Sequence, residues 1–245
     1  MLSNADKKTI RSLKQKKCRD REGLFVVEGL KMVQEALNST CKVRALYVQS
    51  EGLFSGATSI TKQQMSEISH FDTPSPALAV VEKEKKDLLQ TIALVSQSTL
   101  YLGLDSIRDP GNLGTIMRIA DWFGISAIFA SADTVDCYNP KVIQASMGAI
   151  FRVPLFYVDL SEVIDLLSVP VWGTALSGVS LYEANLSSNG VVIIGNESNG
   201  ISQRLQKKID RMLMIPSYHN NADTSESLNA AMATAVVCAE FRRRS

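Results

Sequence analysis

The pattern of apolar and polar positions divides the chain into two blocks. In the first block, which extends to about residue 81, short apolar runs predict strands at residues 24–27, 45–48 and 77–81. Leu30, Val33 and Leu37 have the three- and four-residue spacing of a helix face, and a second helix is predicted at residues 61–68. A charged run at residues 82–87 contains no apolar side chain and predicts a linker.

In the second block, apolar runs alternate with helical patterns. Strands are predicted at residues 99–104, 127–130, 154–158, 171–175, 191–195 and 212–216. Helices are predicted at residues 113–123, 140–150, 161–167, 202–209 and 226–242. This alternation is typical of βαβ units, so the expected fold class is α/β with a mostly parallel sheet and ligands at the ends of its strands. The expected divisions are a domain at 1–82, a linker at 83–97 and a domain at 98–245.

The composition is that of a globular protein, with 45% hydrophobic and 21% charged residues. No apolar run approaches the roughly 20 residues that span a bilayer, and the first residues are polar where a secretory signal needs an apolar core. Cys18, Cys41, Cys137 and Cys238 are far apart, and the chain has two histidines. We therefore expect a soluble cytoplasmic protein with free thiols, no disulfide and no structural metal site.

Basic residues cluster near the start of the chain, although the net charge of the whole is only +1. Residues 1–21 contain eight Lys or Arg and two Asp, which gives this segment +6 and leaves −5 for the remainder. Clustered cations suit contact with a polyphosphate chain, whereas a solvated basic helix without a partner is the alternative. The candidate nucleic-acid contacts are Lys14, Lys16, Lys17, Arg19 and Arg21.

Three polar loops in the second block each follow a predicted strand. The first contains Asp109-Pro110-Gly111-Asn112, a sequence that favours a turn, and Asn112 is expected to cap the helix that follows. Arg118 lies six residues farther along that helix. By itself, this pattern is better explained by a stable strand–turn–helix with a surface arginine.

The second loop follows the apolar run 191–194 and begins Gly195-Asn196-Glu197. Gly195 permits close approach of another backbone segment, and Glu197 is expected at the end of a buried strand, where active-site groups of such sheets lie. The glycines at 195 and 200 do not have the spacing of a dinucleotide fingerprint, and the chain has no Gly-Lys-Ser/Thr phosphate loop. A nicotinamide-dependent enzyme and a nucleoside triphosphatase are therefore poorly supported.

The third loop follows Ile215-Pro216 and leads to Ser227-Leu228-Asn229. Residues 217–225 contain no bulky aliphatic side chain, and the next helix begins with small residues that permit close approach of another backbone segment. An ordinary C-terminal helix with a Ser or Thr cap is the alternative explanation.

Together and in this order, the loops resemble the motifs of the SpoU/TrmH-type RNA 2′-O-ribose methyltransferases of the SPOUT superfamily. Those motifs are Asp-Pro-x-Asn-x-Gly-x-x-x-Arg, Gly-x-Glu-x-x-Gly, and Ile-Pro followed by Ser-Leu-Asn, and every signature position is present. Tyr138-Asn139-Pro140-Lys141 and Ser146-x-Gly148-Ala149 are also similar to this family. Phe25–Gly29 and Thr73-Pro74 resemble its ribosomal-protein-like substrate-binding domain. The loop before Ser227 is a few residues longer than is usual there.

The resemblance implies a catalytic domain with a C-terminal deep trefoil knot, which no pattern argument predicts because knots are nearly absent among folds. It also implies S-adenosylmethionine bound in the knot, a homodimer packed through the knot, structured RNA as substrate, and no metal. Ribosomal RNA is favoured over transfer RNA because a substrate-binding domain precedes the catalytic one. The implied cofactor contacts are Thr174, Ala175, Leu176, Gly195, Asn196, Ile215 and Leu228.

The catalytic residues implied by the motifs are Asn112, Arg118, Glu197, Ser227 and Asn229. A guanidinium stays protonated at ordinary pH, so our hypothesis is that Arg118 binds the neighbouring phosphate and stabilises developing alkoxide, and does not act as a base. Asn112 would orient the ribose or Arg118, and Glu197 would hold that network in place. A non-catalytic RNA-binding protein on the same fold is the alternative, and it would be expected to lose Arg118, Glu197 or Asn229.

Overall fold

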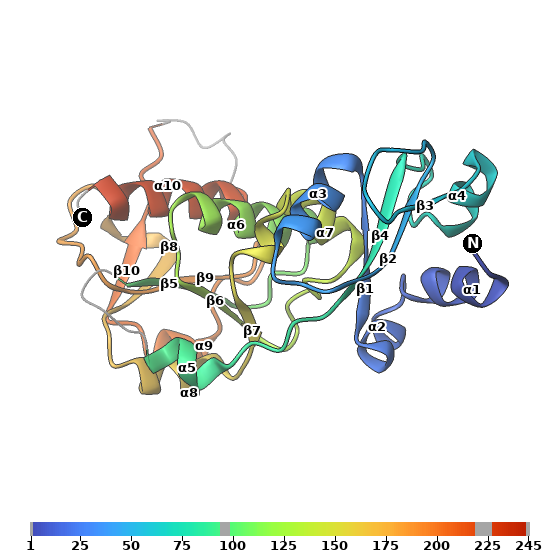
Figure 1. The fold of residues 1–245 in the computed structure, drawn as a ribbon. Coiled ribbons are helices and arrows are strands. Elements are labelled where there is room, and N and C mark those ends of the chain that lie inside the picture. The colour runs from blue at the N-terminus through green and yellow to red at the C-terminus, as the bar shows by residue number, and fades with distance from the viewer. Residues whose placement is uncertain (1, 94–98, 219–226, 244–245) are drawn as a thin grey trace. The chain divides into compact units, whose positions relative to one another are not determined.

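The computed structural model describes residues 2–93, 99–218 and 227–243, which form two compact units (Figure 1). The first unit comprises residues 1–85 and 136–152, and the second comprises residues 86–135 and 153–245. Segment 136–152 thus belongs to the first unit, although the sequence pattern groups it with the second block. This division into compact units differs from the predicted domain boundaries, which stay a prediction.

The first unit is built on a four-stranded sheet in the order β1-β4-β2-β3, in which β2 and β3 are parallel and the other neighbours antiparallel. Its strands are β1 (Leu24–Glu28), β2 (Val43–Val48), β3 (Thr58–Ser59) and β4 (Ala77–Glu82). Its helices before residue 85 are α1 (Asn4–Ser12), α2 (Lys16–Glu22), α3 (Leu30–Asn38) and α4 (Lys62–Ile68). The three strands predicted in the first block correspond to β1, β2 and β4.

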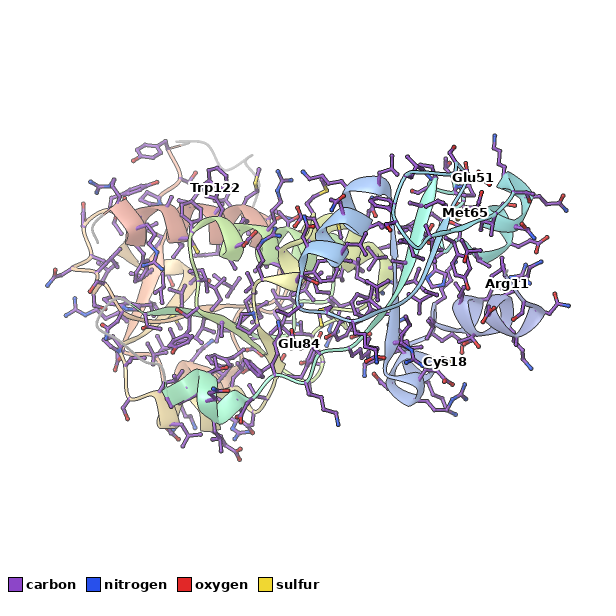
Figure 2. The ribbon with its side chains drawn as sticks, viewed as in Figure 1. Arg11, Cys18, Glu51, Met65, Glu84 and Trp122 are labelled. Atoms are coloured by element: carbon purple, nitrogen blue, oxygen red, sulfur yellow. The ribbon has the colours of Figure 1, made fainter. Side chains whose placement is uncertain are left out.

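One core of this unit lies between α1, α4 and the sheet. Met65, labelled in Figure 2, and Leu78 of β4 are both fully buried in it, together with Ile10 of α1. Helix α4 begins with a capping box, because the Thr61 hydroxyl accepts from the Gln64 amide at 3.1 Å and the Gln64 side chain accepts from the Thr61 amide at 2.9 Å. Local capping and burial of one face therefore favour the same helix.

Segment 136–152 packs on β1 through helix α7 (Pro140–Ser146) and the 3₁₀-helix η1 (Ala149–Phe151). The ring of Phe25 lies 4.7 Å from that of Tyr138 and 6.3 Å from that of Phe151, measured between centroids. The prediction of one helix over residues 140–150 is wrong beyond Ser146, because Met147 and Gly148 are left-handed, with φ of 50° and 94°.

A buried ion pair attaches α2 to this segment. The Arg19 side chain is 3% exposed, and its guanidinium donates to Asp136 Oδ2 at 2.5 and 3.1 Å and to the carbonyls of Leu13 and Lys14 at 2.8 Å. Four of its five N–H groups therefore donate inside the unit. This geometry does not support the prediction that Arg19 contacts RNA, because this arginine holds the N-terminal helices in place.

We expect Asp136→Asn to lower the free energy of unfolding by about 3–5 kcal/mol, because it leaves the Arg19 charge buried without its carboxylate. The matched control is Asp20→Asn, which breaks pairs with Lys16 and Lys83 at a side chain that is 46% exposed and should cost about 1 kcal/mol or less. Urea unfolding of both variants measures the difference. Equal losses in the two variants would contradict the role given to Arg19.

A second buried polar group joins β1 to the loop after α4. The Glu28 carboxylate accepts from the His70 amide and the Ser69 hydroxyl, both at 2.7 Å. His70 Nε2 lies 2.8 Å from the Ile10 carbonyl and must donate to it, which leaves Nδ1 buried without a partner among the described residues. Burial lowers the pKa of His70 below its ordinary 6.5 and raises the pKa of Glu28 above its ordinary 4.5.

The neutral His70 makes a testable contribution to stability. Because its pKa is lower in the folded than in the unfolded chain, unfolding takes up a proton between the lowered value and 6.5, and the free energy of unfolding falls as the pH drops through that window. The variant His70→Gln keeps a side-chain N–H donor but takes up no proton on unfolding. Denaturant titrations from pH 7.5 downward should therefore show wild type losing stability more steeply than the variant. Parallel curves would exclude a neutral buried His70.

The second unit contains a six-stranded sheet, parallel throughout, in the order β10-β8-β9-β5-β6-β7. Its strands are β5 (Leu100–Leu104), β6 (Ala127–Ala130), β7 (Leu155–Tyr157), β8 (Val171–Ser180), β9 (Gly190–Ile194) and β10 (Arg211–Met214). All six strands predicted in the second block are present, and β8 is longer than expected. This confirms the α/β class with a parallel sheet.

Helices cover both faces of this sheet (Figure 1). They are α5 (Leu88–Ala93), α6 (Pro110–Trp122), α8 (Leu160–Leu167), α9 (Gln203–Gln206) and α10 (Ala230–Arg243). Figure 1 shows α6 and α10 on one face and α5, α8 and α9 on the other. Helix α5 lies inside the predicted linker, where Leu88 and Ile92 pack against the core of the sheet. The last part of that linker lies outside the described residues.

The cap of α6 differs from the prediction. Asp109 is the N-cap, and its carboxylate accepts from the Asn112 amide at 2.8 Å. Pro110 occupies the first helical position, where its missing N–H costs nothing. The predicted cap, Asn112, therefore lies inside the first turn, which leaves its side chain free to make the contacts described below.

None of the four cysteines forms a disulfide in the structure. The described residues contain no helix long and apolar enough to cross a membrane. They also contain no group of three or more His, Cys, Asp or Glu placed to hold a metal ion.

Candidate active site

A cavity of about 400 Å³ opens at the carboxyl edge of the second sheet, beside the ends of β9 and β10 and residues 174–176 within β8. All seven residues predicted as cofactor contacts line it: Thr174, Ala175, Leu176, Gly195, Asn196, Ile215 and Leu228. Its volume is in the range of pockets that hold cofactor-sized ligands. Apolar side chains share the wall with backbone groups of the strand-end loops, a surface suited to a flat aromatic ring with a polar edge.

The loop after β9 is closed on itself by backbone hydrogen bonds. The Asn196 amide donates to the Gly200 carbonyl at 3.0 Å, and the Gly200 amide donates to the Asn196 carbonyl at 2.9 Å. A Cβ on Gly195 would lie 2.4 Å from the carbonyl carbon of Gly200, so no side chain fits there. The Asn196 side chain stabilises this form, because its oxygen accepts from the amides of Ser198 and Asn199 at 3.0 and 3.1 Å and its nitrogen donates to the Ser106 carbonyl at 2.9 Å.

Three predicted catalytic residues form one chain of hydrogen bonds. Asn229 Oδ1 accepts from the amides of Ala231 and Met232 at 2.9 and 3.3 Å, which caps α10. Its Nδ2 donates to Asn112 Oδ1 at 2.8 Å, and Asn112 Nδ2 donates to Glu197 Oε1.

The direction of this chain is fixed by chemistry. The two backbone N–H groups of α10 need an acceptor, so Asn229 must turn its oxygen toward them and its NH₂ toward Asn112. Asn112 must then present its NH₂ to the carboxylate of Glu197. The helix cap of α10 thereby sets which face of Asn112 meets Glu197, and the three motifs meet at one place.

Arg118 and Ser227 lie outside this chain. Ser227 and Glu197 line the cavity, whereas Asn112, Arg118 and Asn229 do not. Arg118 is exposed on α6, and its guanidinium makes no hydrogen bond or ion pair with the part of the chain that the structure describes. It is therefore free to bind an anion from solution.

Sequence reasoning missed several residues of the cavity wall. They are Ile194, Ser198, Asn199, Gly200, Ile201, Gln206, Met212, Leu213, Ala230 and Ala233. Gly200 could have been found as the last position of the second motif. The contribution of Gln206 from α9 has no motif signal, because only the fold brings this helix beside the loop.

The remaining basic candidates near the N-terminus are exposed. Lys14 and Lys17 are accessible, Lys16 pairs with Asp20 at 2.9 Å, and Arg21 pairs with Glu22 at 2.8 Å. Exposed pairs of this kind contribute little and exchange readily for another anion. These four side chains stay candidates for RNA contact, unlike Arg19.

Comparison with known proteins matches two parts of the chain to protein families. Residues 99–239 match the model of the SpoU rRNA Methylase family, and residues 4–79 match the MRM3-like substrate binding domain. The chain belongs to the SpoU rRNA methylase family. The longer match covers more than half of the chain and contains all three motif loops.

Relatives cover the chain over nearly its whole length. It is 31% identical to the 23S rRNA (guanosine(2553)-2′-O)-methyltransferase RlmP of Bacillus subtilis (strain 168), over 98% of this chain and 96% of that protein. A TrmH-family structure from Porphyromonas gingivalis is 35% identical with a TM-score of 0.86, covering 100% of both chains. The AdoMet-bound rRNA methyltransferase from Sinorhizobium meliloti is 30% identical with a TM-score of 0.86, covering 100% of this chain and 96% of that one. These matches confirm the predicted family, reaction class and cofactor.

The close approach of Gly195 to Gly200 in the closed loop after β9 predicts the effect of Gly195→Ala. The added methyl group would push the Gly200 backbone away and distort the cavity wall, so we expect affinity for S-adenosylmethionine to fall about tenfold or more. Isothermal titration of the two proteins measures this, with circular dichroism to establish that the variant is folded. Unchanged affinity in a folded variant would show that this loop does not shape the binding site.

Proposed function

We propose that the chain transfers a methyl group from S-adenosylmethionine to a ribose 2′-hydroxyl in structured RNA, with ribosomal RNA as the favoured substrate. The observation that carries this proposal is the hydrogen-bonded chain of Asn229, Asn112 and Glu197, which joins the three motif loops beside the cavity that Glu197 lines. RlmP, which the chain matches over almost its full length, is named as a 23S rRNA 2′-O-methyltransferase. The 23S rRNA (uridine(2479)-2′-O)-methyltransferase of Streptomyces viridochromogenes is 26% identical over 92% of the chain.

The residues of the cavity fit the cofactor. The bare backbone at Gly195 and the small side chains of Ala175 and Ala230 leave room for close contact, while Leu176 and Leu228 supply an apolar surface. When bound, S-adenosylmethionine supplies a methyl group activated by its sulfonium. The chain itself supplies no metal or covalent nucleophile in this proposal, so its task is to orient the ribose and stabilise charge.

Each catalytic candidate has a role consistent with its place. Arg118 binds the phosphate beside the target ribose and stabilises the alkoxide that develops at the 2′-oxygen. Glu197 lies at the cavity wall with its carboxylate oriented by Asn112, where it positions the ribose hydroxyl. Ser227 lines the same cavity, and Asn229 orients Asn112.

The proposal includes the family's deep trefoil knot and a homodimer packed through it. Supporting the dimer, Trp122 at the end of α6 is 85% exposed (Figure 2), and Met232 on α10, which packs against α6, is 62% exposed. The small residues Ala230, Ala231 and Thr234 of α10 are buried within the protomer. They therefore offer little surface for the dimer contact.

The remaining parts of the proposal concern the domains and the compartment. Residues 1–82 would bind RNA through exposed lysines and shape, residues 83–97 would link the domains, and residues 98–245 would carry out methyl transfer. Four free thiols favour a reducing compartment, so we place the protein in the cytoplasm.

Replacing Arg118 tests its role in methyl transfer. We expect Arg118→Ala and Arg118→Lys each to lower kcat for methyl transfer to unmethylated ribosomal RNA about 100-fold or more, because planar bidentate contact with phosphate is lost. Affinity for S-adenosylmethionine should stay within about twofold, since Arg118 does not line the cavity. Labelled methyl transfer with alkaline hydrolysis locates the modified ribose, and Arg211→Ala is an exposed control.

Two results would count against this scheme. Near-normal turnover of Arg118→Lys would show that planar binding is not needed. No labelling of any RNA by the wild-type protein, despite cofactor binding, would favour a non-catalytic RNA-binding protein on the same fold.

A further inference from the structure

A second cavity, of about 480 Å³, opens at the same edge of the second sheet, where β5, β6 and β7 end. Asp105 follows β5, Ser131 follows β6, and Val158 and Asp159 follow β7 and lead into α8. The carboxyl ends of parallel strands are where sheets of this class bind ligands. Neither the motifs nor the roles proposed above use this cavity.

The two cavities share a wall. Ile201 and Gln206 line the first cavity, whereas Ser202 and Leu205, from the same short segment, line the second. Asp105 joins this wall to the sheet, because its amide donates to the Ile194 carbonyl at 2.9 Å and its Oδ2 accepts from the Ser202 amide at 2.7 Å. A molecule in the second cavity therefore lies one wall away from the proposed cofactor.

The second cavity offers a hydrogen-bond acceptor. Asp105 is only 6% exposed, and Oδ2 is taken by Ser202. Oδ1 makes no hydrogen bond with the described residues, and since Asp105 lines the cavity we infer that this oxygen faces it. A carboxylate in such a place pairs with an amino, imino or hydroxyl donor of a ligand.

An aromatic face lies on the same cavity. Tyr157 is 39% exposed, and its hydroxyl donates to the Val135 carbonyl at 2.6 Å, which holds the ring in one orientation. Aromatic side chains held at a surface in this way are platforms on which unpaired bases stack.

Charge argues against an anionic ligand. The cavity has two carboxylates, Asp105 and Asp159, and its only basic lining residue, Arg204, is paired with Asp159 at 2.8 Å. A phosphate would meet net repulsion here, whereas a neutral ring with donor groups on its edge would be accepted.

We propose that this second cavity binds a single unpaired base of the RNA substrate, a neighbour of the nucleotide whose ribose is modified. The base stacks on Tyr157 and donates from its amino or imino edge to Asp105. This inference rests on the proposed function and adds a specificity site to it. The loop that begins at Asp105 leads directly into α6, which carries Asn112 and Arg118, so one continuous segment would contact both nucleotides.

Asp105→Asn tests the acceptor without removing the structural contact. The amide oxygen can still accept from Ser202, but the group that faces the cavity changes from an acceptor to an NH₂ donor. We expect KM for unmethylated ribosomal RNA to rise about tenfold, with unchanged affinity for S-adenosylmethionine. The charge-matched control is Asp165→Asn on α8, whose exposed side chain pairs with Lys208 and does not line the cavity.

Tyr157 provides an independent pair of variants. Tyr157→Ala removes the ring and should raise KM for RNA about tenfold, whereas Tyr157→Phe keeps the ring and should stay near the wild-type value. If both Asp105→Asn and Tyr157→Ala bind cofactor and keep the wild-type KM for RNA, the base site is excluded. A wild-type protein that methylates no RNA would instead refute the proposed function, so the two failures are distinguishable.

Discussion

The side-chain amide of Asn112 can hydrogen-bond to both Asn229 and Glu197 in only one orientation, and the candidate active site depends on this constraint. Asn229 presents its NH₂ because the N-terminus of α10 requires its oxygen, and Glu197 requires a donor. Asn112 lies 85 positions from Glu197 and 117 from Asn229 in the chain, yet this single amide makes the geometry of the three loops interdependent. Displacing the start of α10 would therefore disturb the carboxylate at the cavity wall without any direct contact between them.

The parallel sheet explains why these loops can meet. The three motif loops follow β5, β9 and β10, which belong to one parallel sheet, so all three emerge at the same edge. The closed loop at Gly195–Gly200 then forms the cavity wall, and the segment after it separates the cofactor cavity from the second one. Two adjacent cavities at the carboxyl edge of one sheet suit a reaction between a small cofactor and a long polymer. The cofactor and the polymer can then be held by separate contacts while their reacting atoms lie close together.

Much of this arrangement follows from local patterns. The apolar runs predict the strands, and the seven residues that the motif resemblance predicts as cofactor contacts all line the cavity. Local patterns fail where distant segments decide the outcome. Arg19 belongs to a basic cluster by sequence, but Asp136, far along the chain, buries it. Asn112 looks like a helix cap, but Asp109 takes that place and frees it for Glu197. The helix expected to continue past Ser146 stops because Met147 and Gly148 are left-handed, and the second cavity has no motif at all.

The most direct test of this account is a double-mutant cycle between Asn229→Asp and Asn112→Leu, with kcat for methyl transfer as the readout. The aspartate still caps α10 but cannot donate to Asn112, so the Asn112 amide turns its NH₂ away from Glu197. The account predicts that each single variant loses about the same turnover, and that the double variant loses no more than Asn112→Leu alone. Losses that multiply in the double variant would contradict it, because Asn229 would then act independently of Asn112.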